Sequence, residues 1–245
     1  YHVLEEKGRE PLYDGYVESF TENWEKLDQY DNNAPKTMNA HLHVLEAYTL
    51  LYQCWKDNGL KKRLEFCVDL FMNRIYDPSR KHFNLFFDNE WNSLVEMDSY
   101  GHDVETGWLL CEAARTLENQ DLIEQTNQLA LDVTEACLAE GMSDKGYMIY
   151  EKKGDRKTKH ASWWGQIETV IACVNAWQIS GSDVYLQSVD TVWTFVKDHM
   201  VDKEYGEWYS DCFDGEPKKE APKVSMWRCP YHTVRLGVEM YNRLK

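Results

Sequence analysis

Residues suited to proton transfer lie in the segment 98–105, which reads Asp-Ser-Tyr-Gly-His-Asp-Val-Glu. His102 and Glu105 are three positions apart, so on a helix they would share one face. Asp98 and Ser99 are residue types that cap helix N-termini, and an apolar periodic run follows them. A histidine beside a carboxylate at a helix entrance can act as a general acid or base near neutral pH. The segment therefore predicts a helix that begins with an acid–base pair.

Three other predicted helix entrances carry residues of the same kinds. Asn39 and His43 are four apart and would share one helical face. The tandem Trp163 and Trp164 begin another helical pattern, and His232 begins the last one. Indole rings can stack on a sugar ring, and imidazoles can move its protons. If these entrances come together, the chain has the residues for acid–base chemistry on a carbohydrate.

The elements that must position these residues repeat along the chain. Helical patterns cover about residues 37–55, 60–75, 98–117, 121–140, 162–178, 183–199 and 231–244. Short strand-like pieces occur at 82–87, 146–150 and 205–210, and residues 1–9 resemble the tail of a helix. Successive entrances at Asn39, His102, Trp163 and His232 are 63, 61 and 69 residues apart. Such a repeat of paired helices predicts an all-α toroid of inner and outer helices, with its sites gathered on one face.

Each candidate also has an ordinary structural explanation when it is taken alone. An exposed His102–Glu105 ion pair would be worth little, and tandem tryptophans usually pack in a core. Asn39 and His43 are as consistent with a helix cap and a satisfied polar residue as with a site. The functional hypothesis rests on the recurrence of such residues at equivalent positions of the repeat.

Composition excludes several classes of partner. The net charge of −15 opposes binding to nucleic acid or to an acidic membrane surface. No apolar run approaches the roughly 20 residues of a membrane span. The seven cysteines are scattered and include no CxxC pair, which favours thiols in a reducing cytoplasm over a disulfide scaffold or a zinc knuckle.

Metal and cofactor sites are not predicted. His41 and His43 resemble a metal pair, but two residues apart on a helix they point to different sides. No pair of histidines has the four-residue spacing of a zinc-binding HExxH helix, and neither a phosphate-binding glycine loop nor a GxSxG nucleophile turn is present.

Five motifs together resemble the acylglucosamine 2-epimerase superfamily, most closely its cellobiose 2-epimerases. They occur in the family order and cover essentially the whole chain. The motifs are MNAHLHVLEAYTLLY (38–52), LFFDNEW (85–91), DSYGHDVETGWLL (98–110), WWGQIE (163–168) and WRCPYHTVR (227–235).

The resemblance implies an (α/α)6 barrel and cofactor-independent epimerisation at C2 of the reducing-end glucose of cellobiose or related β-1,4 disaccharides. It assigns the general acid and base to His102 and His232. It associates His43 with opening of the sugar ring. The same resemblance assigns substrate contacts to Asn39, Glu105, Trp227 and one or both of the tandem tryptophans, Trp163 and Trp164.

Family members are about 400 residues long, so residues 1–245 resemble the C-terminal portion of one barrel domain, with about seven or eight of its twelve helices. Such a chain is expected to be a monomer or to associate in a way that completes the barrel. Four other functions stay open: an aldose–ketose isomerase, an N-acylglucosamine 2-epimerase, a glycoside hydrolase and an inactive sugar-binding homologue. A hydrolase would need two opposed carboxylates, whereas histidines dominate these entrances.

Overall fold

The computed structural model of this protein describes residues 1–27 and 29–245. Its residues divide into two compact units, each of which combines two stretches of chain. The first unit consists of Tyr1–Asp98 and Leu109–Thr126, and the second of Ser99–Trp108 and Asn127–Lys245. The prediction of one domain over residues 1–245 stays a prediction.

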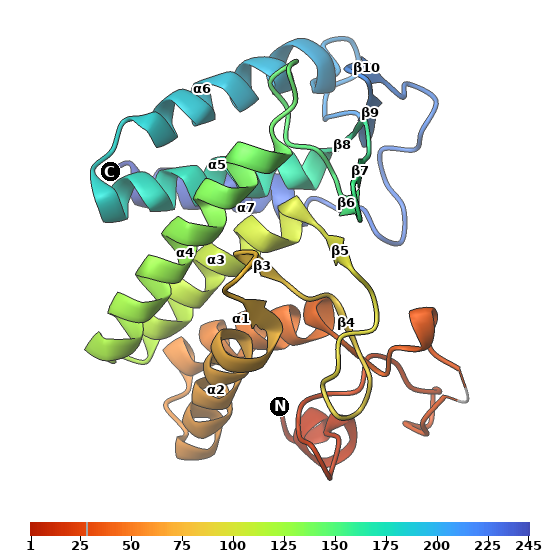
Figure 1. The fold of residues 1–245 in the computed structure, drawn as a ribbon, viewed down its shortest axis with the longest axis vertical. Helices are drawn as coiled ribbons and strands as arrows, with labels where there is room; N and C mark the ends of the chain where they lie inside the picture. The colour runs from red at the N-terminus through yellow and green to blue at the C-terminus, as the bar shows by residue number, and fades with distance from the viewer. Residues whose placement is uncertain (28) are drawn as a thin grey trace. The chain divides into compact units, whose positions relative to one another are not determined.

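Helices form most of the regular structure and follow one another in pairs (Figure 1). They are α1 (Met38–Cys54), α2 (Asn58–Leu70), α3 (Tyr100–Thr116), α4 (Gln120–Gly141), α5 (Trp163–Ser180), α6 (Val184–Phe195) and α7 (Tyr231–Arg243). Short π-helical turns at Leu4–Gly8, Phe71–Ile75 and Val196–Met200 complete the predicted helical segments 1–9, 60–75 and 183–199. The all-α prediction is confirmed, with boundaries that differ by a few residues.

Short strands lead the chain into several helices. In the first unit, β1 (Lys36–Thr37) pairs with β4 (Phe86–Phe87), β2 (Tyr76–Asp77) pairs with β3 (His82–Phe83), and β5 (Met97–Asp98) precedes α3. In the second, β6 (Lys152–Lys153) pairs with β7 (Arg156–Lys157), and β9 (Asp211–Phe213) lies between β8 (His160–Ser162) and β10 (Glu216–Pro217). These pairs are all antiparallel.

Capping side chains fix where two of these helices begin. Thr37 accepts a hydrogen bond from the Ala40 N–H at 3.1 Å, and Ser162 accepts one from the Gly165 N–H at 3.2 Å. Both caps are the last residue of a strand, so the extended backbone turns into a helix at a defined position. The strand pairing before the helix and the capping hydrogen bond together fix the position of the first helical turn.

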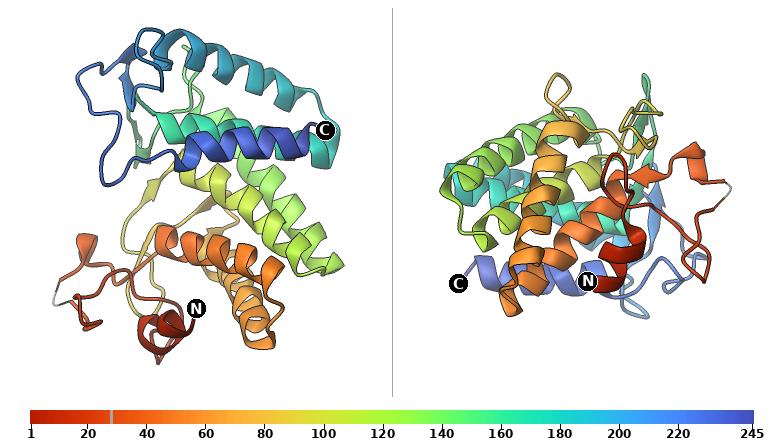
Figure 2. Two further views of the ribbon diagram at one scale, coloured as in Figure 1. Left: turned by 180° about the vertical axis from the view of Figure 1, so that it is seen from behind. Right: turned by 90° about the horizontal axis from the view of Figure 1, so that it is seen from below.

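Helix α5 is the centre of the second unit. Every residue from Gly165 to Ala176 is buried, as expected for a helix at the centre of a core. Helices α6 and α7 pack against it, and Figure 2 shows α7 running along α5. A polar side chain near the start of α5 therefore lies in an interior environment, where it needs a partner.

A recurring turn follows several of the helical segments. Gly15 and Gly146 both have φ of +87°, a left-handed conformation that favours glycine. Each turn closes with a single bridge, between Arg9 and Tyr16 and between Met142 and Met148. The predicted strands at 146–150 and 205–210 are therefore wrong, because each segment contributes only one bridging residue and then bends away.

The described cysteines are free thiols, and five of the seven are buried. The exposed ones are Cys54 and Cys229. Among the described helices, none combines the length and the hydropathy needed to cross a membrane.

Candidate active site

His102 lies in the first turn of α3, where a serine fixes its ring. The Ser99 Oγ lies 2.8 Å from the His102 Nδ1. Ser99 is buried and also accepts the Asp103 N–H through its carbonyl, at 2.9 Å. Because the hydrogen bond occupies Nδ1, it sets the direction in which the Nε2 edge of the imidazole points.

Trp164, at the start of α5, contacts the rings of two histidines. Its ring centroid lies 4.6 Å from that of His102 and 5.7 Å from that of His232, the latter with the rings nearly parallel at 30°. Close packing holds the indole there, since a Cβ on Gly101 would come within 2.7 Å of it. The predicted candidates His102, Trp164 and His232 therefore meet in one cluster of the second unit.

Trp163 has different surroundings from its neighbour. It meets the His232 ring edge-on at 6.2 Å, and the Arg228 guanidinium carbon lies 5.0 Å from its ring centroid. Of the two tandem tryptophans, Trp164 is thus the one that the structure brings next to both histidines.

One helical turn deeper, three charged side chains form a second layer. The Arg235 guanidinium donates through Nη1 to Glu105 Oε1 at 2.5 Å and to Glu168 Oε1 at 3.1 Å. Glu168 also accepts from the His232 Nδ1 at 2.7 Å through Oε1 and from the Trp108 Nε1–H at 2.9 Å through Oε2. The layer holds the His232 ring on a carboxylate that is itself fixed by two further donors.

Spacing explains the two layers. His102 and Glu105 are three apart on α3, and Trp164 and Glu168 are four apart on α5. His232 and Arg235 are again three apart on α7. Three or four residues make one helical turn, so each helix contributes one residue to the outer layer and one to the inner layer.

Burial controls the electrostatics of the inner layer. Glu105 and Glu168 are 2% and 0% exposed, and the Arg235 side chain is 8% exposed. Burial, followed by the nearby charge of Glu168, raises the pKa of the Glu105 carboxyl, while Arg235 acts in the opposite direction. One cation between two buried carboxylates thus leaves Glu105 easier to protonate than an ordinary glutamate.

The same cluster has the composition of a metal site but already contains a cation. Potential ligand atoms of Glu105, Glu168 and His232 lie within 4.8 Å of one another. Arg235 bonds to both carboxylates, so its guanidinium supplies the positive charge between them. The described geometry gives no reason to add a metal to the account of this site.

The first unit holds the other two candidates of α1. Asn39 is partly buried in the first helical turn, and His43 is about half exposed, with its Nδ1 3.7 Å from the Glu46 carboxylate. His41 is wholly buried, accepts the Tyr16 N–H at 2.8 Å through Nε2 and lies 2.6 Å from the Thr37 carbonyl oxygen through Nδ1. Both ring nitrogens of His41 therefore have hydrogen-bond partners within the first unit. Burial lowers the pKa of His41 to about 4.

Trp227, predicted to bind substrate, lies in the loop that precedes α7. Its side chain is largely in solvent, with the residue 84% exposed. Its backbone N–H donates to the Ser225 Oγ at 3.3 Å. An indole this exposed is accessible to a ligand and contributes little to the core.

Four residues of the cluster were absent from the predicted site: Ser99, Trp108, Glu168 and Arg235. Glu168 and Arg235 lie inside the motifs WWGQIE and WRCPYHTVR, one turn beyond the predicted residues. The signal that could have identified them is their three- or four-residue spacing from Trp164 and His232. An acid or arginine at this spacing, in an otherwise apolar segment, must find a partner inside the protein.

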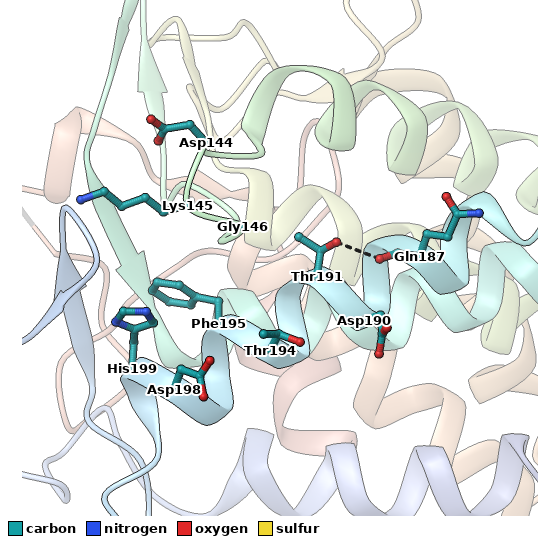
Figure 3. A pocket seen from close by; sticks show the side chains of 10 residues that line it. All are labelled: Asp144, Lys145, Gly146, Gln187, Asp190, Thr191, Thr194, Phe195, Asp198 and His199. Atoms are coloured by element: carbon teal, nitrogen blue, oxygen red, sulfur yellow. Dashed lines mark hydrogen bonds between the residues drawn. The ribbon is translucent and has the colours of Figure 1, made fainter.

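The second unit also has an open hollow of about 580 Å³ whose lining includes neither His102 nor His232 (Figure 3). Residues of the turn 144–146 and of one side of α6 line it, together with His199, whose ring stacks on Phe195 at 4.7 Å. The hollow mixes three aspartates with a lysine and with threonine hydroxyls. It lacks the convergent, buried polar groups that distinguish the cluster around Trp164.

Comparison with known proteins agrees with the five sequence motifs. The sequence profile of the N-acylglucosamine 2-epimerase (GlcNAc 2-epimerase) family matches residues 1–235. The chain belongs to this family. It is 38% identical over 250 aligned positions to the cellobiose 2-epimerase of Bacteroides fragilis, with 98% of this chain and 63% of that protein covered. The cellobiose 2-epimerase of Dictyoglomus turgidum is 34% identical, with 100% of this chain and 64% of the relative covered.

A solved structure shows the same fold. Cellobiose 2-epimerase from Bacillus thermoamylovorans matches with a TM-score of 0.94 and 34% identity, over 99% of this chain and 64% of that one. The predicted paired-helix (α/α) fold is therefore confirmed. The chain spans somewhat less than two thirds of the length of these relatives.

Proposed function

We propose that the protein containing this chain epimerises C2 of the reducing-end glucose in cellobiose or a related β-1,4 disaccharide. The observation that carries the proposal is that the rings of His102 and His232 both contact Trp164. The relatives named cellobiose 2-epimerase support the choice of substrate.

The chemistry requires two proton carriers. After the sugar ring opens to expose the aldehyde, one imidazole removes the C2 proton, and the resulting cis-enediolate is reprotonated on its other face. Inversion at C2 without a cofactor therefore uses one base and one acid on opposite sides of the carbon. General acid–base catalysis contributes about 10²- to 10⁴-fold to a step, so loss of either histidine should nearly abolish turnover.

The inner layer has a positioning role in this proposal. The His102 Nδ1 hydrogen-bonds with the Ser99 Oγ, and the His232 Nδ1–H donates to the Glu168 carboxylate. These bonds orient both imidazoles so that each exchanges a proton through Nε2. Arg235 donates to both Glu105 and Glu168 and so holds Glu168 in place as the acceptor for His232.

The other predicted residues keep roles taken from the family resemblance. We assign ring opening to His43, and substrate contacts to Asn39, Glu105, Trp227 and the tandem tryptophans. The substrate is a neutral sugar, which the net charge of −15 does not oppose. Buried thiols without disulfides fit a reducing compartment such as the cytoplasm.

A glycoside hydrolase fits the same fold less well. It would use one carboxylic acid and one carboxylate that flank the scissile bond. Here Glu105 and Glu168 both bind Arg235 and are buried beneath the histidines. The two carboxylates of the cluster thus bind an arginine and are not placed to flank a glycosidic bond.

Product analysis tests the proposal. The protein is incubated with cellobiose, and the sugars are followed by NMR. Appearance of glucosyl-mannose supports C2 epimerisation, and its absence would reject it. A ketose product would instead indicate an aldose–ketose isomerase, and free glucose a hydrolase. Binding without any product would indicate a sugar-binding homologue.

A further inference from the structure

Helix α7, which carries His232, begins without a capping side chain. Its N-cap is Pro230, and a proline ring has no atom that can accept a hydrogen bond from the first helical turn. Helices α1 and α5 instead begin after Thr37 and Ser162, and both of these side chains accept such a bond. The position of His232, the second residue of α7, must therefore come from contacts other than a cap.

Arg228, two residues before this N-cap, holds the chain in place. It is 3% exposed, and its Nη2 donates to the Trp208 carbonyl oxygen. The same nitrogen lies 3.6 Å from the Glu207 carboxylate. The backbones of Ser225 and Arg228 also bond to each other in both directions, at 3.0 and 3.2 Å. The long loop between β10 and α7 (Figure 1) is thus tied to residues 207–208 just before α7 begins.

The guanidinium of Arg228 also packs on the candidate active site. Its carbon lies 5.0 Å from the Trp163 ring centroid, within the range of a cation–π contact. Trp163 in turn meets the His232 ring edge-on at 6.2 Å. Because Trp163 is the first residue of α5 and directly follows the Ser162 cap, Arg228 links the uncapped start of α7 to the capped start of α5.

Arg228 is costly to bury. Its buried Nε and Nη1 atoms make no hydrogen bond to any residue that the structure describes. Burial lowers the pKa of its guanidinium, and the Glu207 side chain that opposes this effect is itself 45% exposed. A buried cation with such weak compensation adds little to stability. Its contacts with Trp163 and with the loop are better explained by a role in positioning.

We propose that Arg228 is a positioning residue that fixes the entrance of α7 and, through it, the place of His232. This inference rests on the proposed function, in which His232 exchanges a proton with C2 of the sugar. A displacement of about 1 Å at a reacting group can cost about 100-fold in rate. Loss of Arg228 should therefore lower kcat more than it raises KM.

Steady-state kinetics of matched variants test this role. Arg228→Met removes the guanidinium, and Arg228→Lys keeps the charge without the flat group that lies on Trp163. The control is Lys223→Met, which removes the same charge from the same loop. Lys223 donates to the Asp202 carboxylate at 2.5 Å and to the Gly206 carbonyl oxygen at 2.7 Å, so it ties the loop to the same turn farther from α7.

The expected result is a kcat for cellobiose about ten- to hundredfold lower in Arg228→Met, with KM changed by less than about threefold. Arg228→Lys should show a smaller loss of kcat, and it carries the test if Arg228→Met does not fold. Lys223→Met should keep the kcat of the unaltered chain. An unchanged kcat in both Arg228 variants would overturn the proposal. So would an equal loss in Lys223→Met and Arg228→Met, which would indicate general loosening of the loop.

An NMR signature tests the same role without turnover. The His232 Nδ1–H resonance, from the hydrogen bond with Glu168, is assigned by its loss in His232→Gln. It should shift or broaden in Arg228→Met and stay unchanged in Lys223→Met. An unchanged resonance in Arg228→Met would overturn the positioning role. A chain that shows the expected change without forming glucosyl-mannose would reject the function and keep the role of Arg228.

Discussion

Replacing Arg235 by methionine tests the inner layer most sharply. Arg235 is the cation that bonds to both Glu105 and Glu168, and its side chain is 8% exposed. Methionine keeps much of the aliphatic volume and removes the charge. The variant therefore leaves two buried carboxylates facing each other without a cation between them.

The size of the effect should depend on pH. Removing one partner of a buried ion pair costs about 3–5 kcal/mol, and we expect a loss of this size in the free energy of unfolding at pH 8. Protonation of Glu105 removes one of the two buried charges and so reduces this loss. It occurs readily because burial and Glu168 already raise the pKa of Glu105. At pH 5.5, below the raised pKa, Glu105 is protonated both in the unaltered chain and in the variant, so the loss should be smaller than at pH 8.

The sign follows from proton linkage. A carboxyl whose pKa is raised in the folded state binds more protons there than in the unfolded chain, so stability falls as pH rises between the ordinary and the raised pKa. Removing Arg235 raises the Glu105 pKa further and extends this fall to higher pH. The deficit of Arg235→Met should therefore grow from pH 5.5 to pH 8.

Urea unfolding followed by tryptophan fluorescence at both pH values measures the deficit. The matched control is the double variant Glu105→Gln with Arg235→Met, which has a single buried carboxylate left and should lose most of the pH dependence. A deficit of equal size at both pH values, or one below about 1 kcal/mol at pH 8, would show that Arg235 does not neutralise this pair.

Three further predictions concern single side chains. His41 has a folded-state pKa of about 4, so on acidification the unfolded chain takes up this proton first. The free energy of unfolding should therefore fall by up to about 3 kcal/mol between pH 6.5 and pH 4. Unfolding measured across this pH range should lose this part of the fall in His41→Gln. Gly101→Ala would place a Cβ 2.7 Å from the Trp164 ring, so thermal unfolding should show a loss of about 1–3 kcal/mol from overpacking, and an unchanged Tm would show that the ring can move aside. Glu168→Gln should lower kcat by about ten- to hundredfold with little change in KM, since a charge-assisted hydrogen bond to His232 is worth about 1.5–3 kcal/mol; a wild-type kcat would remove Glu168 from the positioning role.

The helices and the placement of the main candidates could be predicted from the sequence. Apolar periodicity and the capping types at Thr37 and Ser162 predict where helices begin, and the repeat spacing predicts that their entrances are equivalent. Helical geometry also separates His41 from His43, and the structure indeed buries one and exposes the other. These features depend on short stretches of chain, which is why the sequence alone determines them.

Long-range partnerships could not be predicted in the same way. Arg235 lies 130 residues from Glu105 in the chain, and no local pattern indicates that they bond. The stretches 146–150 and 205–210 alternate as strands do, yet each finds only a single bridging partner. Whether an alternating segment becomes a strand depends on a neighbour that the segment itself does not specify.

Hydrogen exchange at C2 tests the two-histidine account most directly. His102→Gln and His232→Gln are each incubated in D2O with cellobiose and, separately, with glucosyl-mannose, and deuterium at C2 is read by NMR. With one base on each face, each variant should exchange the C2 proton of only one of the two sugars, the two variants should show opposite preferences, and neither should convert one sugar into the other. Exchange of both sugars by either single variant would contradict the assignment of one histidine to each face.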